Sequence, residues 1–232
     1  VKKMKAIVIS EHGGTEVLKY GEADTPQISS TEVLIKVKAC ALNHLDLWAR
    51  KGLPNVKLPL PLIPGCDISG VVESIGNQVT NCKPGDRVMV SPGLSCGACE
   101  YCLLGEDNLC ASYKVIGYLA NGGYAEYAKA PQQNILPIPQ HIGFEEASAI
   151  PLVFTTAWHM LVTRAKLQPG EDVLIHAAGS GVGMAGIQIA KLIGARVITT
   201  ASSDEKLHKA KELGADETIN YADQDFVKEV KR

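Results

Sequence analysis

The stretch Asp172-Val-Leu-Ile-His-Ala-Ala-Gly-Ser-Gly-Val-Gly183 decides the fold of the second half of the chain. It predicts a buried strand over Asp172–Ala178, a turn dense in glycine, and a helix over Met184–Ile193. Glycine lets the backbone turn tightly and approach a pyrophosphate, and the N-terminus of the helix offers free N–H groups. The match to G-x-G-x-x-G is weak alone but strong between a strand and a helix. We therefore expect a dinucleotide site rather than glycines that only permit close packing, with contacts from Ser180, Gly181, Val182 and Gly183.

The sequence after this turn continues as alternating strands and helices. Strands are predicted over Arg196–Thr200 and Glu217–Asn220, with a helix over Ser203–Leu213 between them and another from Phe226. This order predicts a parallel, doubly wound sheet of the Rossmann type over residues 149–232. Three strands are predicted where the full sheet has about six. We therefore expect a domain from which the C-terminal part of the sheet is missing.

The end of the second predicted strand bears on the choice of nucleotide. An Asp or Glu usually accepts hydrogen bonds from the ribose of NAD at this place. Here Thr200-Ala-Ser-Ser203 follows, with no carboxylate before Asp204. Ser202 and Lys206 could contact a 2′-phosphate, although Lys206 could also be a solvated lysine on a helix face. The sequence favours NADP(H), with NAD as the alternative.

The first part of the chain, residues 1–148, has a different pattern. Short runs rich in Val and Ile alternate with turns rich in Gly and Pro, and one short helix is expected over Leu42–Arg50. This pattern predicts a small, partly open β-barrel. The predicted strands are Lys5–Ser10, Glu32–Ala41, Ile68–Ile75, Arg87–Val90 and Gly123–Ala130.

Within residues 91–112, four cysteines follow the spacing C-x2-C-x2-C-x7-C. Four thiolates at such spacing suit the tetrahedral coordination of zinc, and four protein ligands leave no position open for water or substrate. The segment therefore predicts a structural zinc lobe, with disulfides, an iron–sulfur cluster or free thiols as alternatives. The other cysteines, Cys40, Cys66 and Cys82, are expected to be free thiols. The predicted zinc ligands are Cys96, Cys99, Cys102 and Cys110.

Composition narrows the classes of function. The 232 residues carry a net charge of −2 without a basic block, which argues against a nucleic-acid partner. No run of about eighteen apolar residues predicts a membrane span, and the N-terminus lacks the features of a signal peptide. A cytoplasmic protein acting on a small molecule is expected.

Together these motifs resemble those of the medium-chain dehydrogenase/reductase family, which includes zinc alcohol dehydrogenases and quinone reductases. The resemblance covers the whole chain: the cysteine lobe, the stretch Pro64–Gly76, the turn Lys83-Pro-Gly-Asp-Arg-Val88 and the glycine turn. It implies a GroES-like barrel domain followed by a Rossmann domain, and a homodimer or homotetramer.

The resemblance also shows where this chain departs from the zinc alcohol dehydrogenases. The positions of their three catalytic-zinc ligands fall on Asn43, Cys66 and Leu152, and the neighbouring glutamate falls on Asp67. Leucine cannot bind a metal, and an asparagine oxygen is a poor zinc ligand beside thiolate or imidazole. Cys66 and Asp67 alone are too few for a catalytic zinc, which keeps about three protein ligands.

Other site residues are implied by the same resemblance. The proton-relay histidine of the family falls on Trp48, which cannot exchange protons at neutral pH. Asp46 is retained and could orient its neighbours, and Asn43 could donate a hydrogen bond to substrate. His44 is expected to contact the cofactor pyrophosphate, with a surface histidine as the alternative. Thr156 is expected near the nicotinamide.

Without a catalytic zinc, an alcohol has no Lewis acid to stabilise its alkoxide. Quinones and enones need less help, because the charge that develops on them is delocalised. We therefore expect NADP(H)-dependent hydride transfer to a quinone, enone or related carbonyl, with Asn43 and Asp46 at the reacting centre. The alternatives are a zinc alcohol dehydrogenase with atypical ligands and an inactive NAD(P)-binding homologue.

Overall fold

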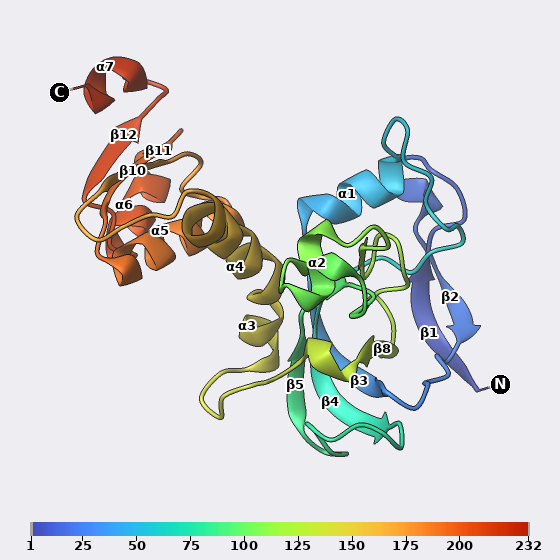
Figure 1. Cartoon of the computed structure of the whole chain (residues 1–232). Coiled ribbons are helices and arrows are strands. Elements are labelled where there is room, and N and C mark those ends of the chain that lie inside the picture. Colours follow the sequence, from blue (N-terminus) through green and yellow to red (C-terminus); the bar gives the residue numbers. More distant parts are fainter. Residues whose placement is uncertain (1, 232) are drawn as a thin grey trace. The chain divides into compact units, whose positions relative to one another are not determined.

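The structure is a computed structural model that describes residues 2–231 (Figure 1). The chain forms two compact units that divide between Leu152 and Val153. The boundary predicted from the sequence lies four residues earlier, between residues 148 and 149. No helix among the described residues is long and apolar enough to cross a membrane.

The first unit is built on a five-stranded antiparallel sheet. Its strands lie in the order β8-β3-β4-β5-β9. The longest pair, β3 and β4, has two register irregularities, which bend the sheet as a partly open barrel requires. Alternate residues point inward, so Val33 and Ile35 are fully buried. The strand bounds are β3 (Glu32–Ala41), β4 (Asp67–Ile75), β5 (Arg87–Val90), β8 (Tyr127–Pro131) and β9 (Ile135–Pro137).

Two hairpins complete the strands of the first unit. β1 (Lys3–Val8) pairs with β2 (Lys19–Asp24), and β6 (Gly93–Leu94) pairs with β7 (Lys114–Val115). The sequence analysis did not predict β2, β6, β7 or β9. β2 is mostly exposed and so lacks an apolar face, and β6 and β7 are too short to show any periodicity. The short helical turns are η1 (Thr15–Val17), α2 (Glu100–Leu103), η2 (Asp107–Leu109) and η3 (Gln132–Asn134).

The strand predicted over Gly123–Ala130 begins only at Tyr127. The residues before it pack against the Pro64–Gly65 backbone instead of extending the sheet. Gly123 N–H donates to Gly65 O at 2.8 Å, and a Cβ on Gly122 would lie 2.1 Å from the same oxygen. The glycines there serve a close backbone approach, which alternation along the sequence does not reveal.

Residues 144–164 form three consecutive helical elements. α3 (Phe144–Ser148) ends before Pro151, which begins α4 (Pro151–Trp158), and a π-helical segment follows over His159–Arg164. Proline lacks the N–H that a helix interior needs, so the break lies at the residue where a new helix can start. The predicted helix near residue 42 is α1 (His44–Lys51).

The second unit contains a parallel three-stranded sheet in the order β10-β11-β12, which confirms the Rossmann-type prediction. β10 ends at Ile175 rather than at Ala178, because Ala177 already turns the chain with a φ of 56°. The core includes Ile187 and Val197, both fully buried. The element bounds are β10 (Asp172–Ile175), α5 (Gly181–Ile193), β11 (Arg196–Ala201), α6 (Asp204–Glu212), β12 (Glu217–Asn220) and α7 (Phe226–Val230).

Candidate active site and cysteine centre

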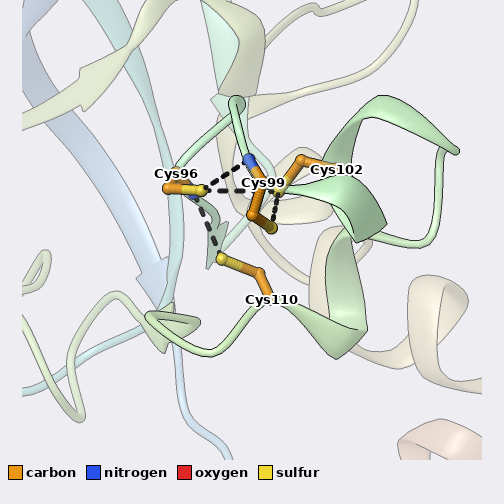
Figure 2. A group of neighbouring side chains, drawn as sticks. All are labelled: Cys96, Cys99, Cys102 and Cys110. Atoms are coloured by element: carbon orange, nitrogen blue, oxygen red, sulfur yellow. Dashed lines mark hydrogen bonds between the residues drawn. The ribbon is translucent and has the colours of Figure 1, made fainter.

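The four cysteines of the lobe converge on one point, as Figure 2 shows. All four sulfur atoms lie within 4.8 Å of one another, with Cys99 and Cys102 3.5 Å apart and Cys96 and Cys102 3.8 Å apart. Zinc with Zn–S bonds of about 2.3 Å separates its sulfur ligands by about 3.8 Å. These distances are much longer than the S–S bond of about 2.05 Å in a disulfide. The cluster therefore has the dimensions of a tetrahedral thiolate site.

Local hydrogen bonds lower the pKa of two of these thiols, Cys96 and Cys110. Cys99 N–H donates to Cys96 Sγ at 3.3 Å, and Cys96 N–H donates to Cys110 Sγ at 3.5 Å. The Ser112 hydroxyl, 3.3 Å from Cys110 Sγ, lowers the pKa of that thiol to about 6, with help from the Cys96 N–H. A lower thiol pKa favours the thiolate, which is the metal-binding form. Within residues 2–231, no other group of three or more His, Cys, Asp or Glu side chains is arranged to hold a metal.

A second cluster surrounds Asp67, and the β3–β4 pairing assembles it. Ala41 pairs with Asp67 across these strands, so Asn43, at the N-terminus of α1, lies beside the start of β4. Asn43 Nδ2 donates to Asp67 Oδ2 at 2.8 Å, and the backbone N–H of Leu152 donates to Oδ1 at 2.8 Å. Asp67 is 1% exposed, and Cys66 beside it is fully buried.

Burial sets the protonation of these groups. It raises the pKa of Asp67 to about 6, although the hydrogen bonds from Asn43 and Leu152 oppose the shift. It also raises the pKa of the Cys66 thiol, with the carboxylates of Asp67 and Asp46 acting in the same direction. Both oxygens of Asp67 already accept hydrogen bonds. This donor set suits a hydrogen-bonded cluster better than a zinc site.

Asp46 supports the cluster from within the first unit. Its Oδ1 accepts from Gly65 N–H at 3.1 Å, and its Oδ2 accepts from Asn43 N–H at 2.7 Å and from the Tyr124 hydroxyl at 2.8 Å. Asp46 thus fixes Asn43 and the turn that carries Cys66. The sequence did not predict the role of Tyr124, because only the packing of its loop on Pro64 and Gly65 brings it to Asp46. His44 is exposed on α1, with its ring 6.1 Å from that of Trp48.

In the second unit, the glycine turn leads directly into α5. Ser180 caps this helix, accepting a hydrogen bond from Gly183 N–H at 3.0 Å. A Cβ on Gly183 would lie 2.3 Å from Ala177 O, so the turn has no room for another residue at this position. Gly179, Ser180 and Gly181 are exposed, and Val182 is half-buried. The exposed backbone at a helix N-terminus is suited to a pyrophosphate. Thr156 lies on α4, in the same unit.

The side chain of Lys206 lies over this turn. A Cβ on Gly179 would be 3.0 Å from Lys206 Cδ, and Lys206 Nζ lies 3.5 Å from Ser202 Oγ. The structure therefore brings Lys206, and with it Ser202, to Gly179 of the glycine turn, which lies 27 residues before Lys206 in the sequence. The nearest following carboxylate, Asp204, accepts a hydrogen bond from Asn220 Nδ2 at 3.0 Å.

The chain matches two family models: the alcohol dehydrogenase GroES-like domain over residues 29–140 and the zinc-binding dehydrogenase model over residues 181–232. An alcohol dehydrogenase of Geobacillus stearothermophilus is 42% identical over 98% of this chain and 67% of its own length. A quinone oxidoreductase of Mus musculus is 35% identical over 99% of this chain and 62% of its own length.

Among solved structures, an NAD-dependent alcohol dehydrogenase superposes with a TM-score of 0.95 at 54% identity, covering 99% of this chain and 67% of that one. A quinone oxidoreductase of Pseudomonas syringae superposes with a TM-score of 0.80 at 35% identity, covering 98% of this chain and 62% of that one. The chain thus spans about two thirds of the length of these relatives. It belongs to the medium-chain dehydrogenase/reductase family of NAD(P)-dependent oxidoreductases.

Proposed function

We propose that the chain is part of an enzyme that transfers hydride from NADPH to a quinone, an enone or a related carbonyl, without a catalytic zinc. The observation that carries this proposal is the hydrogen bond from Asn43 Nδ2 to Asp67 Oδ2, 2.8 Å long. It joins two of the positions that hold or neighbour the catalytic zinc in zinc alcohol dehydrogenases. Leu152, at a third such position, contributes a backbone N–H to the same carboxylate. The carboxylate of Asp67 has both oxygens hydrogen-bonded within the cluster, and the cluster leaves no set of three metal-binding side chains.

Asn43 is the proposed contact to substrate. Its amide carries two N–H groups, of which Asp67 engages one. The other has only a long contact of 3.6 Å with Cys66 Sγ, and a thiol is a weak acceptor. A substrate carbonyl would be the better acceptor, and its oxygen would gain negative charge as hydride arrives. Bound NADPH supplies the hydride, while Asp67 and Asp46 hold Asn43 in place from either side.

We propose that Ser180, Gly181, Val182 and Gly183 cradle the pyrophosphate of the nucleotide, with His44 as a further contact and Thr156 near the nicotinamide. The preference for NADPH rests on Ser202 and Lys206, whose polar atoms lie 3.5 Å apart beside a turn without a carboxylate. Cys96, Cys99, Cys102 and Cys110 would hold one structural zinc, which stabilises the lobe. A homodimer or homotetramer is proposed for the whole enzyme.

The test of the chemistry is the Asn43→Ala variant in the whole enzyme. Loss of a preorganised donor to a developing oxyanion costs about a hundredfold in kcat. We expect a loss of that order in kcat for NADPH oxidation with 1,4-benzoquinone, with a smaller change in the KM for NADPH. Asn81→Ala is the matched control, because Asn81 makes an exposed hydrogen bond to Gln132 O and lies outside the cluster. Unchanged kcat in Asn43→Ala would contradict the assignment.

Nucleotide preference is tested separately with Lys206→Glu. The carboxylate should lower kcat/KM for NADPH by at least about tenfold and leave that for NADH nearly unchanged. Lys211→Glu, on the same exposed helix, is the matched control. A wild-type enzyme that prefers NADH would overturn the NADPH assignment without touching the proposal for Asn43.

Zinc alcohol dehydrogenase chemistry is the second candidate. It is favoured by the name of the 54% identical structure, an NAD-dependent alcohol dehydrogenase. Zinc content per chain distinguishes the two candidates. One zinc, lost in Cys99→Ser, agrees with a purely structural ion. Two zincs, one of which survives that substitution, together with alcohol oxidation, would establish a catalytic zinc at Cys66 and Asp67.

A further inference from the structure

The first unit contains a pocket of about 410 Å³ that is separate from every residue assigned above. It lies where the β1–β2 hairpin, strand β8 and the β6–β7 hairpin meet. Ligand pockets in proteins commonly measure about 300 to 1,000 Å³, so this pocket can enclose a small molecule. None of its lining residues belongs to the glycine turn, to the Asp67 cluster or to the four cysteines.

The lining includes a buried apolar part and an exposed polar part. Met4, Ile63, Ile116 and Ala128 line the pocket, and each is at most 5% exposed. These side chains belong to the cores of the unit, so their positions are fixed by packing before any ligand arrives. A preformed apolar wall of this kind favours an apolar ligand body, because burying it removes apolar surface from water.

The acidic side chains at the pocket are paired with lysines, whereas one basic side chain there is not. Both acidic side chains in the lining have partners: Asp24 pairs with Lys3 at 2.6 Å, and Glu32 pairs with Lys129 at 3.0 Å. Within the described part of the chain, the Lys114 ammonium group has no hydrogen-bond or ion-pair partner. A second cation, Lys2, lies 5.5 Å from the centre of the Tyr127 ring, which also lines the pocket. The uncompensated charge beside the apolar wall is therefore positive.

We propose that this pocket binds a small amphipathic carboxylate. Its apolar body would pack against Ile63 and Ile116, and its carboxylate would pair with Lys114. Charge-assisted hydrogen bonds between an ammonium and a carboxylate are stronger than neutral ones. The acids Asp24 and Glu32 do not oppose this ligand, since each is neutralised by its own lysine.

The test uses octanoate as the probe and octanamide as its uncharged counterpart, with binding measured calorimetrically on the whole enzyme. We expect octanoate to bind and octanamide to bind at least about tenfold more weakly. Lys114→Glu should weaken octanoate binding by at least about tenfold, while Lys38→Glu, an exposed lysine outside the pocket, should not. Absence of octanoate binding, or equal affinity in Lys114→Glu, would overturn the proposal.

Two further measurements locate the bound probe. Ile63 and Ile116 methyl resonances should shift on addition of octanoate, whereas Ile187 and Ile198 in the second unit should not. Ala120→Phe places a ring in the pocket and should abolish binding with quinone reduction unchanged. Shifts confined to the second unit would show that octanoate occupies the nucleotide site and would refute the assignment. Tighter binding of octylamine than of octanoate would refute the assigned charge.

Discussion

The carboxylate of Asp67 is charged in a place where charge is costly. The residue is 1% exposed, and its two oxygens accept one hydrogen bond each, from Asn43 and Leu152. Two donors compensate only part of the hydration that the carboxylate loses, so its pKa stays raised to about 6. Asp67 is therefore ionised near neutral pH at a cost to stability. In a purely structural position, an apolar residue of the same size would cost less free energy to bury. The cost of burying Asp67 therefore supports a role in holding Asn43.

The raised pKa predicts how stability depends on pH. The pKa of Asp67 is about 6 when folded and about 3.9 when unfolded, so between these values the folded state binds more protons. Its contribution to stability is complete below about pH 4 and is lost as the pH rises through 6. Relative to Asp67→Asn, the wild type should gain about 1 kcal/mol in unfolding free energy between pH 7 and pH 5. Urea titrations at both values measure this, and a difference that is constant with pH would contradict the raised pKa.

Tyr124 supports the same cluster indirectly, through its contact with Asp46. Its hydroxyl donates to Asp46 Oδ2 at 2.8 Å, and Asp46 is only 9% exposed. Tyr124→Phe leaves that oxygen with one donor fewer, and we expect a loss of about 1 to 3 kcal/mol in unfolding free energy. Tyr20→Phe is the matched control, because Tyr20 is 71% exposed and should change stability little. If both variants were equally stable, the contact between Tyr124 and Asp46 would have no energetic role.

At the scale of elements, two glycines of the motif, Gly183 and Gly186, have different environments. A Cβ on Gly183 would lie 2.3 Å from the backbone oxygen of Ala177, whereas a Cβ on Gly186 would make ordinary contacts of 3.5 to 3.9 Å. Gly183→Ala should therefore destabilise the second unit by about 2 to 3 kcal/mol. Gly186→Ala, inside α5, should be neutral or stabilising by up to about 1 kcal/mol. Thermal unfolding of the two variants checks this, and equal losses would contradict the distinction.

Features formed by residues close along the chain could be predicted from the sequence, whereas long-range contacts could not. Strands β11 and β12 and the cysteine cluster depend on residues close along the chain, so periodicity and spacing revealed them. The bond from Tyr124 to Asp46 spans 78 residues, and the position of Lys206 over Gly179 spans 27. Contacts of this range are set by tertiary packing, which local pattern does not encode. Raised pKa values could not be predicted from the sequence either, since they depend on burial, which is a property of the folded chain.

At the scale of the whole molecule, each unit has a hydrophobic core of its own. One core contains Ile187 and Val197 in the second unit, and another contains Val33 and Ile68 in the first. Separate cores permit separate local unfolding, with opening free energies that differ between parts of the chain. The cysteine lobe has little core of its own: Cys96 is exposed, and Leu103 and Leu104 are each 75% exposed. A metal ion would therefore supply much of its cohesion.

The small core of the cysteine lobe predicts that metal removal would loosen the lobe and leave the second unit unchanged. The β6–β7 hairpin consists of two-residue strands, and the chain between them carries all four cysteines. If the four cysteines hold zinc as proposed, a chelator that removes the ion also removes the link between the cysteines of the connection between β6 and β7. Amide exchange at Val115 and Ile116 should then become faster by about one to two orders of magnitude, which corresponds to about 1.4 to 2.8 kcal/mol. Strands β10 to β12, in the other unit, should keep their protection.

Hydrogen exchange with mass spectrometry, read peptide by peptide, measures both effects in one experiment. Cys99→Ser should reproduce the faster exchange without any chelator, because it removes one of the four sulfurs. Cys82→Ser is the matched control, since Cys82 lies outside the cluster. Exchange that accelerates equally in both units would mean that chelation unfolds the whole molecule. Exchange that does not change would mean that the lobe is held by its protein contacts alone, and the structural role of the metal would then be refuted.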